Sequence, residues 1–391
     1  MKQGYFYFLA LVVITSFSVA QTLSPKAEIS VLTIGPGQAL NDAFGHNAFR
    51  IKDPANGLDV TYDYGRFDFN TPNFYLKFAS GKLNYAIGKS KYNDIYGFYT
   101  WQNRRVEEQK LNLTQPQKQA IYNYLATNYK PENRYYLYDF FYDNCATKIK
   151  DVVAETLNHN LQFHAPKDFK PKTFRTLIQE NLSWNSWGSV GIDIALGAVI
   201  DKTATLEEHM FLPQYINSLF GLATINTNNT SLVTSKQTLY KPKNPKTANV
   251  WSIIISPIVV FSLLALIIGY ITFQDSKKQS RSIWLDGVIF GITSFIGILL
   301  LLLWFATNHQ ATANNYNLLW ASPLSLLALK SVLSQTPKVW VRKYLKFLLI
   351  CLALLAFHWL TGVQQFALAL LPLFVALAYR YIYLINALKD H

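Results

Sequence analysis

Cys145 is the residue of this 391-residue chain whose type and position best suit chemistry. The second cysteine, Cys351, falls within an apolar segment, so the two thiols are expected in different environments and unpaired. A helix expected over residues 145–157 begins at Cys145 itself. At such a helix start the backbone N–H groups and the helix dipole lower a thiol pKa, and the same groups can hold an oxyanion. The alternative is a buried, inert cysteine.

A thiolate nucleophile needs a base, and His46 has the most suitable context for one. It opens a strand expected over residues 46–51, directly after Phe44-Gly45, where glycine permits a close approach of the backbone. An imidazole on a strand facing a thiol on a helix is the arrangement of papain-like enzymes. The other histidines before the apolar half lie in polar or structural contexts: His159, His164 and His209.

A third group should orient the imidazole, and the next expected strand, residues 60–64, offers two. Asp63 can accept a hydrogen bond from the ring and fix its tautomer, whereas Tyr64 would do so less strongly. Asp63 is therefore the chosen catalytic partner. Tyr64 stays open as the alternative and as a substrate contact. Asn144, one of two candidate N-caps of the Cys145 helix with Asp143, is also assigned to substrate binding.

The elements that must position these side chains follow an α+β pattern without internal repeats. Alternating and apolar runs predict strands, and helical spacing after Thr114 and after Asn144 predicts two helices. The expected strands are residues 28–34, 46–51, 60–64, 83–90, 104–111 and 135–138, and the helices are 115–129 and 145–157.

The composition divides the chain into an exported part and a membrane part. Half of the residues are hydrophobic and only 15% are charged, which argues against a disordered or purely soluble protein. Residues 1–20 have the pattern of a cleaved export signal, and residues 21–240 form an aqueous domain. A Lys/Pro/Asn linker over 241–249 precedes a transmembrane domain over 250–391. About five spans are expected, near residues 250–273, 283–305, 318–333, 344–360 and 366–385.

Basic residues predict how the spans are oriented. Lysine and arginine gather between the first and second spans and between the third and fourth, whereas the loops 306–317 and 361–365 have none. By the positive-inside rule, the basic loops face the cytoplasm. The exported domain then faces the periplasm, on the outer side of a bacterial inner membrane.

Several segments resemble one known family, the Lnb-type lipoprotein N-acyltransferases. One is the His46 segment from Gly35-Pro36-Gly37 to Arg50, followed by Tyr62 to Phe69. Another runs from Tyr138 to Thr147 around the cysteine, and further matches lie at residues 187–197, 210–213 and 308–320. The resemblance covers nearly the whole mature chain.

The resemblance implies a fold, a reaction and two partners. The exported domain is expected to be a circularly permuted papain-like (NlpC-like) domain, in which histidine precedes cysteine. The implied activity moves an acyl chain from a membrane phospholipid, through a thioester on Cys145, to the N-terminal amine of a diacylglyceryl-cysteine lipoprotein. His46 and Cys145 match the family's catalytic positions.

Two other classes of function remain as alternatives. One is a membrane-tethered NlpC-like peptidoglycan amidase or endopeptidase, although a single anchor helix would suffice for tethering. The other is a non-enzymatic envelope binding or assembly protein in which Cys145 is inert.

The remaining assignments concern ligands. Arg175 and His309, the latter on an outer loop, are predicted to contact the phospholipid headgroup. No cofactor is expected, and no cluster with metal-ligand spacing is present in the sequence. Nucleic-acid binding is not expected, because the net charge of +13 is spread along the chain and not gathered into a basic block.

Overall fold

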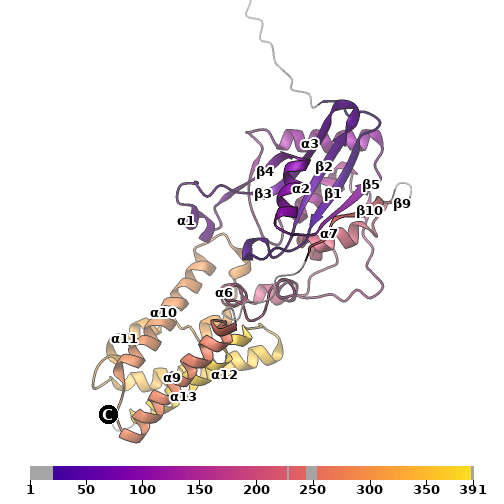
Figure 1. Ribbon diagram of the computed structural model, residues 1–391. Helices are drawn as coiled ribbons and strands as arrows, with labels where there is room; N and C mark the ends of the chain where they lie inside the picture. Colours follow the sequence, from indigo (N-terminus) through magenta and orange to yellow (C-terminus); the bar gives the residue numbers. More distant parts are fainter. Residues whose placement is uncertain (1–20, 227–228, 244–252, 389–391) are drawn as a thin grey trace, which may run out of the picture.

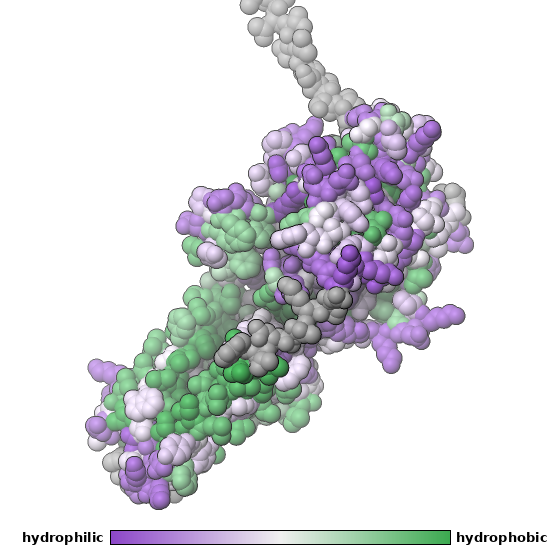
Figure 2. All heavy atoms as spheres, in the orientation of Figure 1, coloured by the Kyte–Doolittle hydropathy of each residue, from purple (hydrophilic) through white to green (hydrophobic). Residues whose placement is uncertain are grey.

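The computed structural model describes residues 21–226, 229–243 and 253–388. The predicted export signal at residues 1–20 lies outside the described residues, as does part of the predicted linker. Figure 1 shows an N-terminal α/β domain standing at one end of a bundle of helices. Figure 2 shows that the surface of this bundle is largely hydrophobic and that of the α/β domain largely hydrophilic.

The centre of the α/β domain is a seven-stranded antiparallel sheet. Six of its strands confirm the sequence prediction to within a few residues, and β1 matches it at both ends. The seventh strand, β10, was missed because its residues are mostly polar and exposed, as suits an edge strand. In spatial order the strands are β10 (Val233–Tyr240), β5 (Val106–Leu111), β1 (Glu28–Ile34), β2 (His46–Asp53), β3 (Leu58–Arg66), β4 (Asn84–Lys91) and β6 (Tyr135–Leu137).

Helices cover both faces of this sheet. Helices α3 (Gln115–Asn128), α4 (Cys145–Thr156) and α7 (Pro213–Phe220) share one buried cluster with residues of β1, β2 and β3. The predicted helix α4 is amphipathic, and its buried residues Ile149, Val152 and Val153 belong to this cluster. The other face packs against α2 (Tyr92–Trp101), which the sequence analysis did not predict.

Shorter elements complete the domain and connect it to the bundle. They are the helices α1 (Phe74–Ala79), α5 (Phe174–Gln179) and α6 (Trp187–Ala195) and the small strands β7 (Leu161–Gln162), β8 (Thr224–Ile225) and β9 (Thr230–Ser231). The order of the strand with His46 before the helix with Cys145 is as expected. The assignment to the permuted papain-like class stays a prediction.

Four stretches of the bundle are long and apolar enough to cross a membrane. They are α9 (Pro257–Lys278), α10 (Ile283–Phe305), α12 (Val339–Thr361) and residues Leu368–Ala387, which include α13 (Leu371–Ala387). The expected count of about five spanning helices is therefore not exact among the described residues, because the predicted span at 318–333 is not one continuous helix.

The interruption lies between a short 3-10 turn, Tyr316–Leu319, and helix α11 (Ser325–Val332). Pro323 cannot donate a helical hydrogen bond, and the irregular backbone around it packs against Gly297 of α10. A Cβ atom at Gly297 would lie 2.1 Å from the carbonyl oxygen of Ala321, so glycine is required there.

The broken segment nevertheless connects the two ends of the bundle. At one end Asn317 donates to the carbonyl of Asp193 over 2.9 Å, which joins it to the α/β domain. At the other end Arg281, in the basic loop after α9, donates to the carbonyl of Ser334 over 3.2 Å. The segment is therefore attached near both ends of the bundle, beside the four long apolar stretches.

The α/β domain contacts the bundle through helix α6. The side-chain amides of Asn315 and Asn317 donate to the carbonyls at the end of this helix. Backbone hydrogen bonds from Gly197 to Ala311 (2.9 Å) and from Ala198 to Asn314 (3.0 Å) continue the contact. A polar outer loop therefore satisfies the carbonyls at which α6 ends.

Arg175 lies beneath this contact and not at a lipid-facing surface. Its side chain is 1% exposed, and its guanidinium pairs with Asp193 and Asp201, each over 2.9 Å. It also donates to the carbonyls of Leu196 and Gly197. This burial contradicts the prediction that Arg175 contacts a phospholipid headgroup, because its charge is already neutralised inside the protein.

Replacing Arg175 should destabilise the whole chain. The change Arg175→Met leaves two carboxylates without their buried partner, which typically costs about 3–5 kcal/mol. We expect the thermal unfolding midpoint of the detergent-solubilised full chain to fall by about 6–10 °C. The matched control is Arg105→Met, which removes a half-exposed pair with Glu107 and should change little. Equal midpoints for the two variants would contradict the structural role of Arg175.

Candidate active site

The site forms where the first residue of β2 meets the first residue of α4. His46 begins the strand and Cys145 begins the helix, and their side chains lie close enough for each to shift the pKa of the other. Gly45, just before the strand, has φ +84, and a Cβ atom there would lie 2.6 Å from the carbonyl oxygen of Ile34. The expectation that glycine allows a close backbone approach before His46 is therefore confirmed.

Asn144 holds the start of α4 in place. Its side-chain oxygen accepts from the backbone N–H groups of Ala146 (2.7 Å) and Thr147 (2.9 Å). Its side-chain nitrogen donates to the carbonyls of Phe140 (2.7 Å) and Phe211 (2.8 Å). Because both ends of this buried amide are engaged within the protein, the predicted substrate contact for Asn144 does not fit. Asn144 is a positioning residue.

The cap also limits which backbone groups can hold an oxyanion. The N–H groups of Ala146 and Thr147 are occupied by Asn144, so they are not available as the sequence analysis expected. The N–H of Cys145 is left without a hydrogen-bond partner among the residues that the structure describes. It is the group of this first turn that can stabilise negative charge on a reacting carbonyl.

The electrostatics of the pair favour a thiolate beside an imidazolium. Burial by itself would raise the pKa of the Cys145 thiol, but the charge and hydrogen bond of His46, with a hydrogen bond from the Asn47 backbone, lower it below its usual value. Burial opposes the charged form of His46 as well. The electrostatic influence of Tyr99 and of Cys145 and the bond to Asp63 nevertheless raise the pKa of His46. The direction of both shifts favours the thiolate, which is the nucleophilic form of the sulfur.

Asp63 orients the imidazole. The Nε2 atom of His46 lies 3.2 Å from Oδ2 of Asp63, which leaves Nδ1 for the thiol. Burial would raise the pKa of Asp63, but hydrogen bonds from His46 and Arg66 hold it below its usual value. The carboxylate therefore stays charged and can stabilise an imidazolium.

Arg66, which the sequence analysis missed, extends this network by one step. Its Nε atom donates to Oδ1 of Asp63 over 2.9 Å, and its Nη2 atom donates to Ser90 over 2.8 Å. Gly65, which lies between Asp63 and Arg66 in the chain, has φ +91, and the register of β3 shifts in this segment. Gly88 leaves the space that Arg66 fills, since a Cβ atom at this glycine would lie 1.9 Å from Nε. The sequence contains one signal for this pairing, because Arg66 follows Asp63 by three residues and comes directly after a glycine.

Tyr64 lies on the other face of β3 and is buried in the domain core. Its hydroxyl donates to Asn128 of α3 over 2.8 Å. The structure therefore places Asp63, and not Tyr64, against the imidazole. The burial of Tyr64 also contradicts its predicted contact with substrate.

The other histidines are placed elsewhere. His209 is buried, with its Nδ1 atom 2.6 Å from the carbonyl of Thr205, and His164 bonds the hydroxyl of Thr224 over 2.9 Å. His309 lies on the outer loop after α10, where its Nε2 atom is 3.0 Å from the carbonyl of Phe78. His309 thus fastens α1 to the bundle, and its contact with a headgroup stays a prediction.

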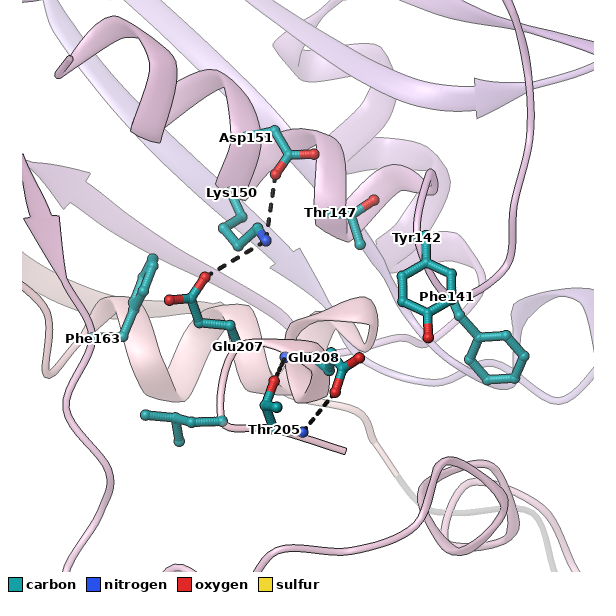
Figure 3. A pocket seen from close by; sticks show the side chains of 10 residues that line it. Phe141, Tyr142, Thr147, Lys150, Asp151, Phe163, Thr205, Glu207 and Glu208 are labelled. Atoms are coloured by element: carbon teal, nitrogen blue, oxygen red, sulfur yellow. Dashed lines mark hydrogen bonds and ion pairs between the residues drawn. The ribbon is translucent and has the colours of Figure 1, made fainter. Parts of the chain in front are cut away.

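A hollow of about 640 Å³ opens beside another face of α4. Figure 3 shows Thr147, Lys150 and Asp151 of this helix lining it opposite Glu207 and Glu208. Its charges are paired within the protein, for example Lys150 with Asp151 over 3.4 Å. Neither Cys145 nor His46 lines this hollow. The reacting pair therefore lies outside it.

The assembled groups are those of covalent acyl chemistry. Cys145 can supply a nucleophile, His46 can act as its base, and Asp63 is a carboxylate that can orient the base. Within the described ranges, no three His, Cys, Asp or Glu side chains come together as ligands for a metal ion.

Comparison with known proteins identifies both halves of the chain. Residues 18–180 match the family model of the Lnb N-terminal periplasmic domain, and residues 248–391 match that of the Lnb transmembrane domain. The two matches cover more than three quarters of the chain. A periplasmic domain joined to a transmembrane domain makes this a multi-pass protein of the inner membrane. No curated protein and no solved structure matches the chain.

The ion pair predicts how the thiol reacts as pH changes. In a Cys351→Ser background, iodoacetamide should alkylate Cys145 well below the pH at which an ordinary thiol ionises, because the Cys145 pKa is lowered. Removing the imidazole by His46→Asn should raise the thiol pKa, so that the rate at pH 6 falls by about tenfold or more. The rate is measured by mass spectrometry of the full chain between pH 5 and pH 10.

His164→Asn is the matched control, because that ring is bound to Thr224. It should leave the alkylation profile unchanged. Asp63→Asn should shift the profile in the same direction as His46→Asn but less, since it removes only the orienting carboxylate. An unchanged profile in His46→Asn would contradict the ion pair.

Proposed function

The chain belongs to the Lnb family, and on that premise we propose that it is a lipoprotein N-acyltransferase. The proposed reaction moves an acyl chain from a membrane phospholipid to the N-terminal amine of a diacylglyceryl-cysteine lipoprotein. The observation that carries the proposal is a thiol–imidazole–carboxylate set in a domain fastened to the outer end of a membrane bundle. Both proposed substrates are held in that membrane by their acyl chains.

In the first step the Cys145 thiolate attacks the ester carbonyl of the phospholipid. A bond forms between sulfur and the acyl carbon, and the negative charge that develops on the carbonyl oxygen is stabilised by the N–H of Cys145. When the ester bond breaks, the His46 imidazolium gives its proton to the departing oxygen. The products are a thioester on Cys145 and a lysophospholipid.

In the second step the lipoprotein amine attacks the thioester. An α-amino group has a pKa near ~8, so an uncharged fraction is available at neutral pH. Neutral His46 accepts the amine proton as the amide bond forms, and the sulfur leaves as a thiolate. The ion pair is thereby restored for the next cycle.

Asp63 and Arg66 support both steps through His46 and do not touch the reacting atoms. Asp63 stabilises the imidazolium and fixes its orientation. Arg66 in turn holds the carboxylate in its ionised form. They are positioning residues for the histidine.

The membrane bundle supports this function over peptidoglycan hydrolysis. A hydrolase of cell-wall peptides needs no more than one anchor helix. Here α6 and the outer loop with Asn315 and Asn317 join the domain to a bundle with four long apolar stretches. Holding both lipids at one membrane surface raises their effective concentration at the thiol.

The proposed activity predicts the chemistry of lipoprotein N-termini in cells. Expressed in a bacterium whose own lipoproteins stay diacylated, the full chain should add one amide-linked fatty acid to their N-terminal cysteines. Cys145→Ala and His46→Ala should each lower this product by at least about a thousandfold. The double variant should cost little more, because the two residues act in the same step. Mass spectrometry of the N-terminal lipopeptides measures the product.

Cys351→Ala is the matched control, because this thiol is buried in the bundle, and it should retain full activity. Full activity in Cys145→Ala would contradict the proposal. Release of peptides from purified peptidoglycan by the full chain, without lipoprotein acylation, would favour the hydrolase instead.

A further inference from the structure

Residues 67–82, which we call the aromatic arm, project from the α/β domain between β3 and β4 and contain α1. Apolar side chains cover this arm, and four of them are more than half exposed: Phe69 (67%), Tyr75 (79%), Leu76 (70%) and Phe78 (54%). Such a gathering of exposed apolar groups on one short segment is typical of a surface that contacts a partner or a membrane.

Contacts with the bundle hold the arm at the outer end of α10. The backbone N–H of Asn308 donates to the carbonyl of Ser80 over 3.0 Å, and the His309 ring lies 3.0 Å from the carbonyl of Phe78. Gly81, with φ +68, packs closely against Asn308. These residues follow α10 directly, so the arm lies at the level where that apolar helix ends.

The figures show the same placement. In Figure 1, α1 lies beside the upper end of α10, apart from the main sheet. In Figure 2, green surface on the arm lies close to the green surface of the bundle. The arm therefore continues the apolar surface of the bundle toward the α/β domain. Its charged residues are Asp68, Lys77 and Lys82, and two cations against one carboxylate suit a phosphate-bearing surface.

A row of aromatic rings leads from this arm toward the thiol. Phe67 packs against Phe74 of α1 (ring centroids 5.7 Å apart) and against Tyr85 of β4 (5.4 Å). Tyr85 stacks on Tyr138 at 4.5 Å. A Cβ atom at Gly65 would lie 3.6 Å from Tyr138 and 4.0 Å from Cys145, so the last ring of the row and the cysteine border the same glycine.

We propose that the aromatic arm lies in the outer leaflet of the membrane and that an acyl chain of the donor phospholipid runs along Phe67, Tyr85 and Tyr138 to Cys145. The second part rests on the proposed function, because it assigns the donor chain of that reaction. An acyl chain is the occupant that fits, since the row is aromatic and begins where the bundle meets lipid. Burial of the arm in lipid would also remove its exposed apolar side chains from water.

Insertion of the arm can be measured without any catalysis. The change Tyr75→Cys is made in a Cys145→Ser/Cys351→Ser background, and the new cysteine is labelled with an environment-sensitive fluorophore. The labelled chain is then reconstituted into vesicles of phosphatidylethanolamine and phosphatidylglycerol. We expect a blue-shifted emission that is quenched by lipids with a nitroxide on the acyl chain. The matched control is Ala120→Cys, an exposed site on α3, which is the helix drawn at the end of the α/β domain away from the bundle in Figure 1; its label should be neither shifted nor quenched.

Delivery of the acyl chain is tested in the active full chain. The triple change Tyr75→Ser/Leu76→Ser/Phe78→Ser should slow acylation of Cys145 from vesicle phospholipid by about tenfold or more, because it removes the large apolar side chains that would be buried in the lipid. Alkylation of Cys145 by iodoacetamide should be unchanged, which shows that the thiol pair is intact. Leu222→Ser, an exposed apolar residue after α7, should not slow acylation.

The outcomes separate this proposal from the proposed function. An unquenched label at position 75 overturns the arm proposal, even if lipoproteins are acylated normally. A blue shift without lipid quenching means that protein covers the arm, and also overturns it. A quenched label, together with a Cys145 that never becomes acylated in the unlabelled active chain, supports the membrane contact and contradicts the acyltransferase. A quenched label with a slow triple variant supports both parts.

Discussion

The charge pair between Cys145 and His46 is the interaction on which the rest of the α/β domain depends. Both groups are buried, and burial alone would favour their neutral forms. The charged forms are nevertheless favoured, because each ion stabilises the other and because Asp63, itself bound by Arg66, is bonded to the imidazole. The N-cap by Asn144 fixes the position of Cys145, because it determines where α4 begins. The sheet and helices serve to bring these ends together.

A second constraint is that the domain with this pair is fixed to the membrane bundle. The α/β domain is not connected to the bundle by the linker alone, because α6 ends on the side chains of Asn315 and Asn317. Arg175 stabilises this contact from within, through Asp193 and Asp201. On the proposed function, this arrangement keeps the thiol at a fixed height above the lipids. That requirement would account for the buried polar contacts between the α/β domain and the bundle.

Local signals in the sequence predict the candidate site residues, and long-range contacts account for the residues that the sequence does not predict. A helix start and strand alternation are readable in sequence, so Cys145, His46 and Asp63 are candidates from sequence, and the structure brings the three together. Arg66 was missed because its place depends on a shift in register and on the space above a glycine in the next strand. Arg175 was misplaced for the same kind of reason, since its two carboxylates come from later segments. Hydropathy predicts residues 318–333 as one membrane span. It does not report that the backbone of this segment is broken where it packs against α10.

The central proposal, that Cys145 carries the acyl chain, can be measured on the purified protein. The full chain with Cys351→Ser is incubated with phospholipid vesicles and no lipoprotein, quenched with acid and analysed by intact mass spectrometry. We expect a mass increase of one fatty acyl group on Cys145, which neutral hydroxylamine removes and which is absent in His46→Ala. Acylation of added lipoprotein at full rate with no such adduct, at any time point, would contradict the covalent role of Cys145.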